Sequence, residues 1–202
     1  MNAMQVAQRI TADEYLAYDG EERRTWLVDG QIVVNQPSFR HQALHGRLFA
    51  ALQGWIEAGD ARGFVVSPLD VQLDDHNVYA PDLFWYQASR VPAFDARGPY
   101  PLPDLALEIR SPSTWRYDVG TKKRVYERDG LPELWLVDGE SGVVLVFRRS
   151  TPSAPVFDVE RAGVRRRARA RRLGDAHLAA AARLRARRRR AVRAQPPPGV
   201  TR

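Results

Sequence analysis

Cysteine is absent from the 202 residues of the chain. Its absence excludes disulfide bonds, iron–sulfur clusters and thiolate zinc sites, and it fits a reducing compartment. Long apolar runs are also missing: no stretch approaches the roughly 18 apolar residues that span a bilayer, and the first residues show no apolar core of a secretion signal. The sequence therefore predicts a soluble, cytoplasmic protein with no membrane partner.

Charge is divided unevenly along the chain. Residues 1–160 contain 16 Lys and Arg against 23 Asp and Glu, whereas residues 161–202 contain 15 Arg against one Asp, so the formal net charge of +7 averages two unlike parts. An acidic body suits an enzyme whose clustered carboxylates are offset by a divalent metal better than it suits a passive nucleic-acid binder. We expect one domain over residues 1–160 and a disordered or irregular Arg-rich tail over 161–202.

The order of helix and strand signals predicts an α/β domain with a mixed central sheet flanked by helices. Thr11 followed by Glu14 is a capping box that begins a short helix, and Asp29-Gly30 between apolar runs predicts a hairpin. Apolar positions at helical spacing predict a long helix over residues 40–57. The further expected elements are strands at 64–66, 71–73, 78–80, 82–85 and 107–110, a helix from about 114 to 129, and a hairpin over 134–147.

Two acids interrupt otherwise apolar, strand-like runs. Asp82 lies in Pro-Asp-Leu-Phe-Trp and Glu108 lies in Leu-Glu-Ile-Arg-Ser. A carboxylate that faces a core costs several kcal/mol unless it is paired or binds a cation. If the two strands are neighbours, Asp82 and Glu108 can hold one Mg²⁺ or Mn²⁺ while water completes the coordination shell.

Basic groups follow the second acid closely. Glu108 and Arg110 share one face of a strand because side chains alternate, and Lys122 and Lys123 lie on the helix that follows. A bound metal polarises a phosphate and lowers the pKa of an attacking water, while an ammonium nearby stabilises the developing charge. This set of groups predicts metal-dependent phosphodiester hydrolysis.

A structural interpretation of the same residues stays open. Asp82 can serve as a strand-start residue, and Glu108 can pair with Arg110 or Arg116 at the surface; the two acids together with Lys122 favour the metal site. His41, before a helix, is typical of a solvated or capping residue, although it is also placed to face a cleft entrance.

Several motifs in order resemble the Uma-type putative restriction endonuclease family of the PD-(D/E)XK nuclease superfamily. The resemblance runs from about residue 11 to 147 and rests on Thr-x-x-Glu-Tyr-Leu at 11–16, Val-Asp-Gly at 28–30, His41, Pro-Asp at 81–82, Leu-Glu-Ile-Arg-Ser-Pro-Ser-Thr at 107–114, the segment 118–126, and Gly-Leu-Pro-Glu-Leu-Trp-Leu-Val-Asp at 130–138. It implies a restriction-endonuclease-like core, a Mg²⁺-dependent phosphodiesterase site and a DNA substrate. It also permits a homodimer.

The resemblance assigns roles to particular residues. Asp82 takes the first metal-ligand position and Glu108 the second, and Arg110 occupies the place of the superfamily lysine. Arginine does not readily transfer protons, so Arg110 would bind phosphate. Lys122 is similar to the lysine that this family offers instead and becomes the expected catalytic amine, with Lys123 as a substitute.

Two departures from the family pattern leave alternatives open. Trp26 stands where the family has an acid before its Leu-Val-Asp-Gly turn, so an auxiliary ligand is missing. The tail replaces an expected apolar closing segment, either as a genuine basic arm or through a shifted reading frame. The sequence thus predicts a metal-dependent DNA endonuclease. The alternative is a catalytically inactive nuclease-fold protein that binds nucleic acid through its basic tail.

Overall fold

The computed structural model describes residues 9–18, 25–34 and 37–163. The first helix, α1 (Ala12–Ala17), begins with the predicted capping box: Glu14 N–H donates to Thr11 Oγ1 at 3.2 Å, and Thr11 N–H donates to the Glu14 carboxylate at 2.7 Å. These bonds satisfy two backbone donors that a helix start would otherwise leave unpaired. The expected helix is therefore confirmed.

A four-stranded antiparallel sheet forms from the first hairpin and the polar turn that follows. Its strands are β1 (Thr25–Val28), β2 (Gln31–Val34), β4 (Val71–Asp74) and β5 (Asn77–Tyr79), in the order β2-β1-β5-β4. Between β1 and β2, Asp29 and Gly30 have φ angles of 49° and 73°. Two successive left-handed residues make the hairpin turn that Asp-Gly predicts.

The central sheet has six strands and is mixed, as expected. Its order is β10-β9-β8-β7-β6-β3, and the strands are β3 (Phe64–Val66), β6 (Leu83–Tyr86), β7 (Leu105–Ile109), β8 (Glu133–Asp138), β9 (Val143–Arg148) and β10 (Asp158–Gly163). Among the strands of this sheet that the structure describes, only β7 and β8 pair in parallel. All of these strands were predicted from the sequence except β10, which pairs along the whole of β9.

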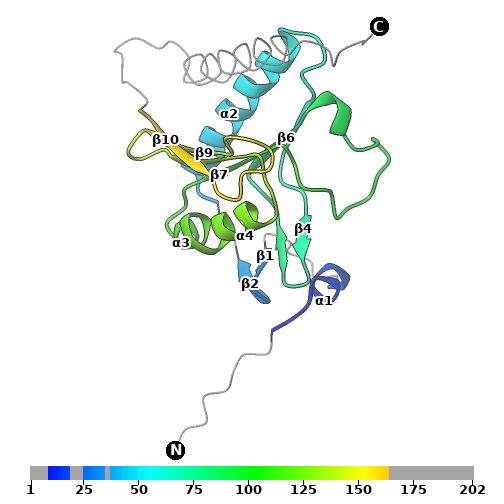
Figure 1. Ribbon diagram of the computed structural model, residues 1–202. Coiled ribbons are helices and arrows are strands. Elements are labelled where there is room, and N and C mark those ends of the chain that lie inside the picture. The colour runs from blue at the N-terminus through cyan, green and yellow to red at the C-terminus, as the bar shows by residue number, and fades with distance from the viewer. Residues whose placement is uncertain (1–8, 19–24, 35–36, 164–202) are drawn as a thin grey trace, which may run out of the picture.

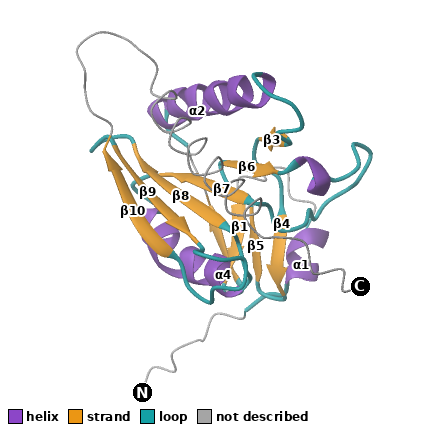
Figure 2. Cartoon of the chain, turned by 45° about the horizontal axis from the view of Figure 1, so that its top comes forward, coloured by secondary structure: helices purple, strands orange, loops and turns teal. Residues whose placement is uncertain are grey.

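Helices cover both faces of the central sheet (Figures 1 and 2). The long helix α2 (Phe39–Glu57) packs on one face, where Leu44 and Leu48 contact the core cluster that contains Leu107. The other face packs against α4 (Lys123–Arg128) and the first sheet. Because side chains alternate along β7, Leu107 faces α2 and Glu108 faces α4.

The helical segment after β7 is not uniform. It consists of α3 (Trp115–Tyr117), a π-helical turn η2 (Asp118–Lys122) and α4, and it ends before Gly130, whose φ is 86°. A single helix was expected here, and the π turn is the difference. The loop before β7 contains a short 3₁₀ helix, η1 (Ala88–Arg90). No helix in the described ranges is long and apolar enough to cross a membrane.

Candidate active site

The two acids predicted as metal ligands are brought together by strand pairing. Leu83 of β6 pairs with Leu107 of antiparallel β7, so the next step along the ladder sets Asp82 opposite Glu108. Asp82 directly precedes β6, and its Oδ2 accepts a hydrogen bond of 2.7 Å from Ile109 N–H. This bond joins Asp82 to Ile109, which directly follows Glu108 on β7. Their nearness, which the sequence left conditional, is a property of the fold.

Helix α2 contacts Asp82 through two histidines. His41 Nε2 lies 3.2 Å from Asp82 Oδ2, and His45 Nε2 lies 2.9 Å from the main-chain oxygen of Asp82. Because carboxylate and carbonyl oxygens only accept hydrogen bonds, each imidazole nitrogen must carry the proton of its bond. Ser38 caps the helix through a bond from His41 N–H. The expectation that His41 is a solvated or capping residue is therefore wrong, because Ser38 is the cap and the His41 side chain is buried against Asp82.

Glu108 belongs to a buried charge cluster on the opposite side of β7 from α2. Lys122 Nζ lies 2.6 Å from Glu108 Oε1 and 3.2 Å from Asp118 Oδ1, and Tyr126 donates a 3.0 Å hydrogen bond to the same Glu108 oxygen. Both lysine contacts are ion pairs. Glu108, Asp118 and Lys122 are at most 2% exposed. The alternative interpretation, in which Glu108 pairs with Arg110 or Arg116 at the surface, is therefore wrong.

Aromatic rings from the first sheet enclose the ammonium of Lys122. Its Nζ lies 4.1 Å from the ring centroid of Trp26 on β1 and 5.4 Å from that of Tyr79 on β5. The electron-rich ring faces attract a cation. Trp26, which stands where the motif resemblance would place an acid, therefore contributes a ring beside Lys122 and not an oxygen ligand.

Burial sets the proton affinities of this cluster. Burial raises the pKa of Glu108 to about 8, and Lys122 opposes this shift. Burial also raises the pKa of Asp118, again against the effect of Lys122. The pKa of Lys122 is raised because Glu108 and Asp118 outweigh its own loss of hydration. The charge of Asp82 helps to raise the pKa values of Glu108, Asp118 and Lys122. Three acidic side chains, those of Asp82, Glu108 and Asp118, are thus set against one lysine.

The π turn places Asp118 and Lys122 in this cluster. It spans the five residues from one to the other, at the point where the helix passes Glu108. A π turn widens a helix and displaces side chains from their α-helical positions, and such turns are frequent at functional sites. Asp118 thereby forms an ion pair with Lys122, four positions further along the chain.

Arg110 and Lys123 lie outside this cluster. Arg110 follows β7, forms a 2.7 Å ion pair with Asp138 and lies 5.7 Å from the Trp115 ring. Lys123 pairs with Glu127 and contacts the rings of Phe147 and Phe157 on another side of the helix. The structure therefore joins Asp82, Glu108 and Lys122 and leaves the other two basic residues apart.

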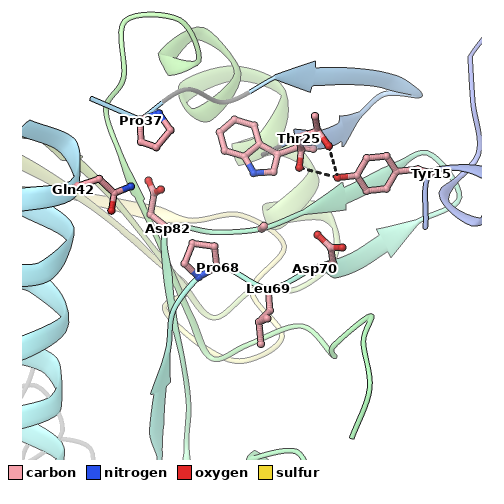
Figure 3. A pocket seen from close by; sticks show the side chains of 10 residues that line it. Tyr15, Thr25, Pro37, Gln42, Pro68, Leu69, Asp70 and Asp82 are labelled. Atoms are coloured by element: carbon pink, nitrogen blue, oxygen red, sulfur yellow. Dashed lines mark hydrogen bonds between the residues drawn. The ribbon is translucent and has the colours of Figure 1, made fainter. Parts of the chain in front are cut away.

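A hollow opens beside Asp82 (Figure 3). Its cavity volume is about 380 Å³, within the usual range for a small-molecule site of roughly 300–1,000 Å³. Its lining residues come from α1, β1, α2 and the segments around β4 and β5, and they are Tyr15, Thr25, Trp26, Pro37, Gln42, Pro68, Leu69, Asp70, Ala80 and Asp82. The Asp82 carboxylate points into this space, so a ligand there would meet one acid directly.

The residues present fit a hard divalent cation with few protein ligands. Asp82 Oδ2 and Glu108 Oε1 are engaged, whereas no described residue donates a hydrogen bond to Asp82 Oδ1 or Glu108 Oε2. Over the described ranges, no group of three or more His, Cys, Asp or Glu side chains is arranged to hold a metal. Mg²⁺ commonly takes one or two carboxylates and keeps several waters. A two-carboxylate site with an excess of acid meets that requirement.

The contacts made by His41, Asp118 and Tyr126 were not predicted. Asp118, Lys122 and Tyr126 recur at intervals of four residues, which is a signal for a shared helix face. No comparable signal exists for His41, because its partner Asp82 lies 41 positions away in the sequence. Only the packing of α2 against the start of β6 joins them.

The arrangement of sheets and helices is similar to a nuclease fold. The chain is similar to the crystal structure of a putative nuclease belonging to DUF820 from Anabaena variabilis, with a TM-score of 0.65 and 20% sequence identity. The match covers 83% of this chain and 92% of that one. None of the curated proteins compared with the chain matched it.

The sequence profile of the Uma2 family, described as putative restriction endonuclease, matches residues 12–162. The chain belongs to this family. The match confirms the resemblance seen in the motifs and covers every strand described above, apart from the last residue of β10.

Proposed function

We propose that the protein is a metal-dependent DNA endonuclease that hydrolyses a phosphodiester bond with a metal-activated water. The observation that carries the proposal is the hydrogen bond from Ile109 N–H, next to Glu108 on β7, to Asp82 Oδ2 at the start of the neighbouring strand β6, with the buried Lys122 ammonium 2.6 Å from Glu108. Membership of a restriction-endonuclease family supports DNA as the substrate.

Asp82 and Glu108 would hold a Mg²⁺ or Mn²⁺ ion, with water completing its coordination shell. When bound, such an ion polarises the phosphate and lowers the pKa of the attacking water. Lys122 and Tyr126 engage Glu108 Oε1 and so orient this carboxylate. The positive charge of Lys122 also offsets the acids and stabilises negative charge that develops at the phosphate.

Arg110 has a supporting role in this proposal. It is partly exposed, with a side chain at 36% of full accessibility, and it lies at the end of the strand that carries Glu108. It would bind a phosphate beside the scissile one, exchanging its ion pair with Asp138 for that contact. A homodimeric state and a cytoplasmic location remain predictions.

The test is cleavage of supercoiled plasmid and single-stranded circular DNA by the full chain, with Mg²⁺, Mn²⁺ or EDTA. Asp82→Asn, Glu108→Gln and Lys122→Met are compared with the wild type, and Asp75→Asn, an exposed acid in the β4–β5 turn, is the matched control. We expect cutting only with metal, a loss of about 100-fold or more in the three site variants, and wild-type rates in the control.

Circular dichroism must show that each variant is folded. A folded wild type that binds DNA but cuts neither substrate with either metal would contradict the proposal. That result would favour the inactive nuclease-fold protein that binds through its basic tail. Equal cutting in EDTA would exclude the metal-dependent mechanism and leave the nuclease fold.

A further inference from the structure

We infer that His41 is a positioning residue that fixes the Asp82 carboxylate so that Oδ1 is presented to a divalent cation. The inference rests on the proposed function, since it concerns the same carboxylate. It adds a role on α2, an element that supplies neither proposed metal ligand.

The contacts of Asp82 are unequal between its two oxygens. Oδ2 receives the Ile109 N–H at 2.7 Å and the His41 imidazole at 3.2 Å, whereas Oδ1 receives no hydrogen bond from any described residue. Two donors on one oxygen determine the rotation of a carboxylate about its last torsion. The remaining oxygen is thereby left for a ligand in the hollow that Asp82 lines.

The backbone of Asp82 is held by the same helix. His45 lies one helical turn after His41 and donates to the Asp82 main-chain oxygen at 2.9 Å. The two imidazoles thus divide the work: His45 fixes the position of the residue, and His41 fixes the direction of its side chain. They also attach the long helix directly to the metal-ligand position.

His41 is a poor choice for packing alone. The residue is 5% exposed, and its Nδ1 is buried without a well-formed hydrogen bond in the described part of the chain. A buried polar atom without a partner lowers stability, so an apolar side chain of similar size would suit a purely structural position better. The compensating gain is the contact with Asp82. In known metal sites, partners that orient the ligands typically contribute 10–100-fold in metal affinity.

The experiment is calorimetric titration of Mn²⁺ into the metal-stripped full chain, without DNA. We expect His41→Ala to weaken Mn²⁺ binding by about 10–100-fold. His41→Gln keeps an N–H donor that can reach Oδ2, and we expect it to recover most of the affinity. His76→Gln is the matched control, because His76 contacts the Ile10 carbonyl away from this site, and its affinity should equal the wild type.

Asp82→Asn separates the two possible failures. If Asp82→Asn binds Mn²⁺ like the wild type, the proposed metal site itself is wrong. If Asp82→Asn loses binding while folded His41→Ala and His41→Leu both keep wild-type affinity, only the role of His41 is overturned. The leucine variant serves where alanine does not fold. The Mn²⁺ dependence of cleavage gives a second readout: His41→Ala should raise the half-saturating Mn²⁺ concentration more than it lowers the maximal rate.

Discussion

Lys122 is the residue whose environment departs most from that of an ordinary lysine. Its side chain is fully buried, and its charge is balanced by Glu108 and Asp118 and enclosed by Trp26. Such a cluster does not stabilise a protein as well as a packed apolar core does, because each ion loses its hydration. A buried charge cluster at the end of β7 therefore points to a role in the chemistry of the site and not in stability.

Replacing Lys122 with methionine should destabilise the protein in a pH-dependent manner. Without the ammonium, Glu108 and Asp118 are buried unpaired acids, and removing one partner of a buried pair costs about 3–5 kcal/mol. Their folded-state pKa values, already raised, rise further, so protonation relieves the cost at low pH and the loss grows as pH increases. Urea unfolding at pH 6 and pH 8.5 measures this difference.

Lys123→Met is the control for that experiment. Lys123 is partly exposed and pairs with Glu127 four positions along the helix, so its removal should cost only about 0.5 kcal/mol. An equal loss of stability for Lys122→Met at both pH values would show that the two carboxyls do not take up protons.

Asp138 should contribute to stability at neutral pH and lose that contribution in acid. Burial would raise its pKa, but hydrogen bonds from the Ser141 and Glu140 N–H groups and from Arg110 lower the pKa to about 2. A lowered folded-state pKa gives stability above the unfolded pKa of about 4 that disappears as pH falls toward 2.

Asp138→Asn should therefore cost about 1 kcal/mol at pH 7 and progressively less below pH 4. Urea melts of wild type and variant at several pH values measure the difference. If the free energies of unfolding of wild type and Asp138→Asn differ by the same amount at every pH down to 2.5, the Asp138 carboxylate makes no pH-dependent contribution to stability. The turn between β8 and β9 would then be held mainly by its backbone pairing.

Among the elements, the helical segment after β7 has the clearest functional consequence. A regular α-helix was expected from the sequence, but the π turn from Asp118 to Lys122 interrupts it. A π turn is equivalent to one residue inserted into an α-helix. Gly120 lies in this turn, and a Cβ added there would meet no atom within 4 Å apart from its chain neighbours and the backbone of its own helix.

Two changes at Gly120 should distinguish the effect of the π turn on nuclease activity from its effect on stability. Gly120→Ala should keep nuclease activity and stabilise the chain by about 0.5–1 kcal/mol, because alanine favours helix and fits the open space. Deleting Gly120 should convert the π turn to α-helix. The spacing of Asp118 and Lys122 then changes, and activity should fall about 10-fold or more, while the melting temperature stays close to that of the wild type.

Thermal melts and plasmid cleavage of both variants provide the measurement. If the deletion variant unfolds, the π turn is needed for packing and not only for the placement of the two charges. If it cuts DNA at the wild-type rate, the alignment of Asp118 with Lys122 does not matter to catalysis.

The molecule as a whole has an acidic body and a basic tail. Residues 164–202, which contain most of the tail arginines, lie outside the described residues and outside the family match. The proposed site is built entirely from the body. Chemistry and non-specific DNA affinity should therefore be separable.

A chain that ends at Gly163, the last residue of β10, should retain metal-dependent cleavage at saturating DNA while its affinity for DNA falls. The dependence of log K on log salt should also become shallower, by about 0.9 for each duplex phosphate that the tail neutralises in the full chain. Fluorescence anisotropy at several salt concentrations measures both quantities. Unchanged affinity and salt slope would show that the tail does not bind phosphates.

Local signals in the sequence were sufficient for most of the elements. Thr11 with Glu14, and Asp29 with Gly30, determine a helix start and a turn through bonds and dihedral angles within a few residues, so neighbours in the sequence suffice. The acids at positions 82 and 108 stood out because a carboxylate in an apolar strand needs a reason. The family motifs, which are also local, supported a nuclease from the sequence alone.

The tertiary structure decided which side chains meet. The pairing of β6 with β7 sets Asp82 opposite Glu108, the packing of α2 brings His41 to Asp82 across 41 positions of sequence, and β1 places Trp26 over Lys122. The strand β10 and the π turn were likewise missed, because each depends on what it packs against. Secondary structure follows largely from periods and caps within the chain, whereas a site depends on contacts between distant segments, and only the packed fold determines those.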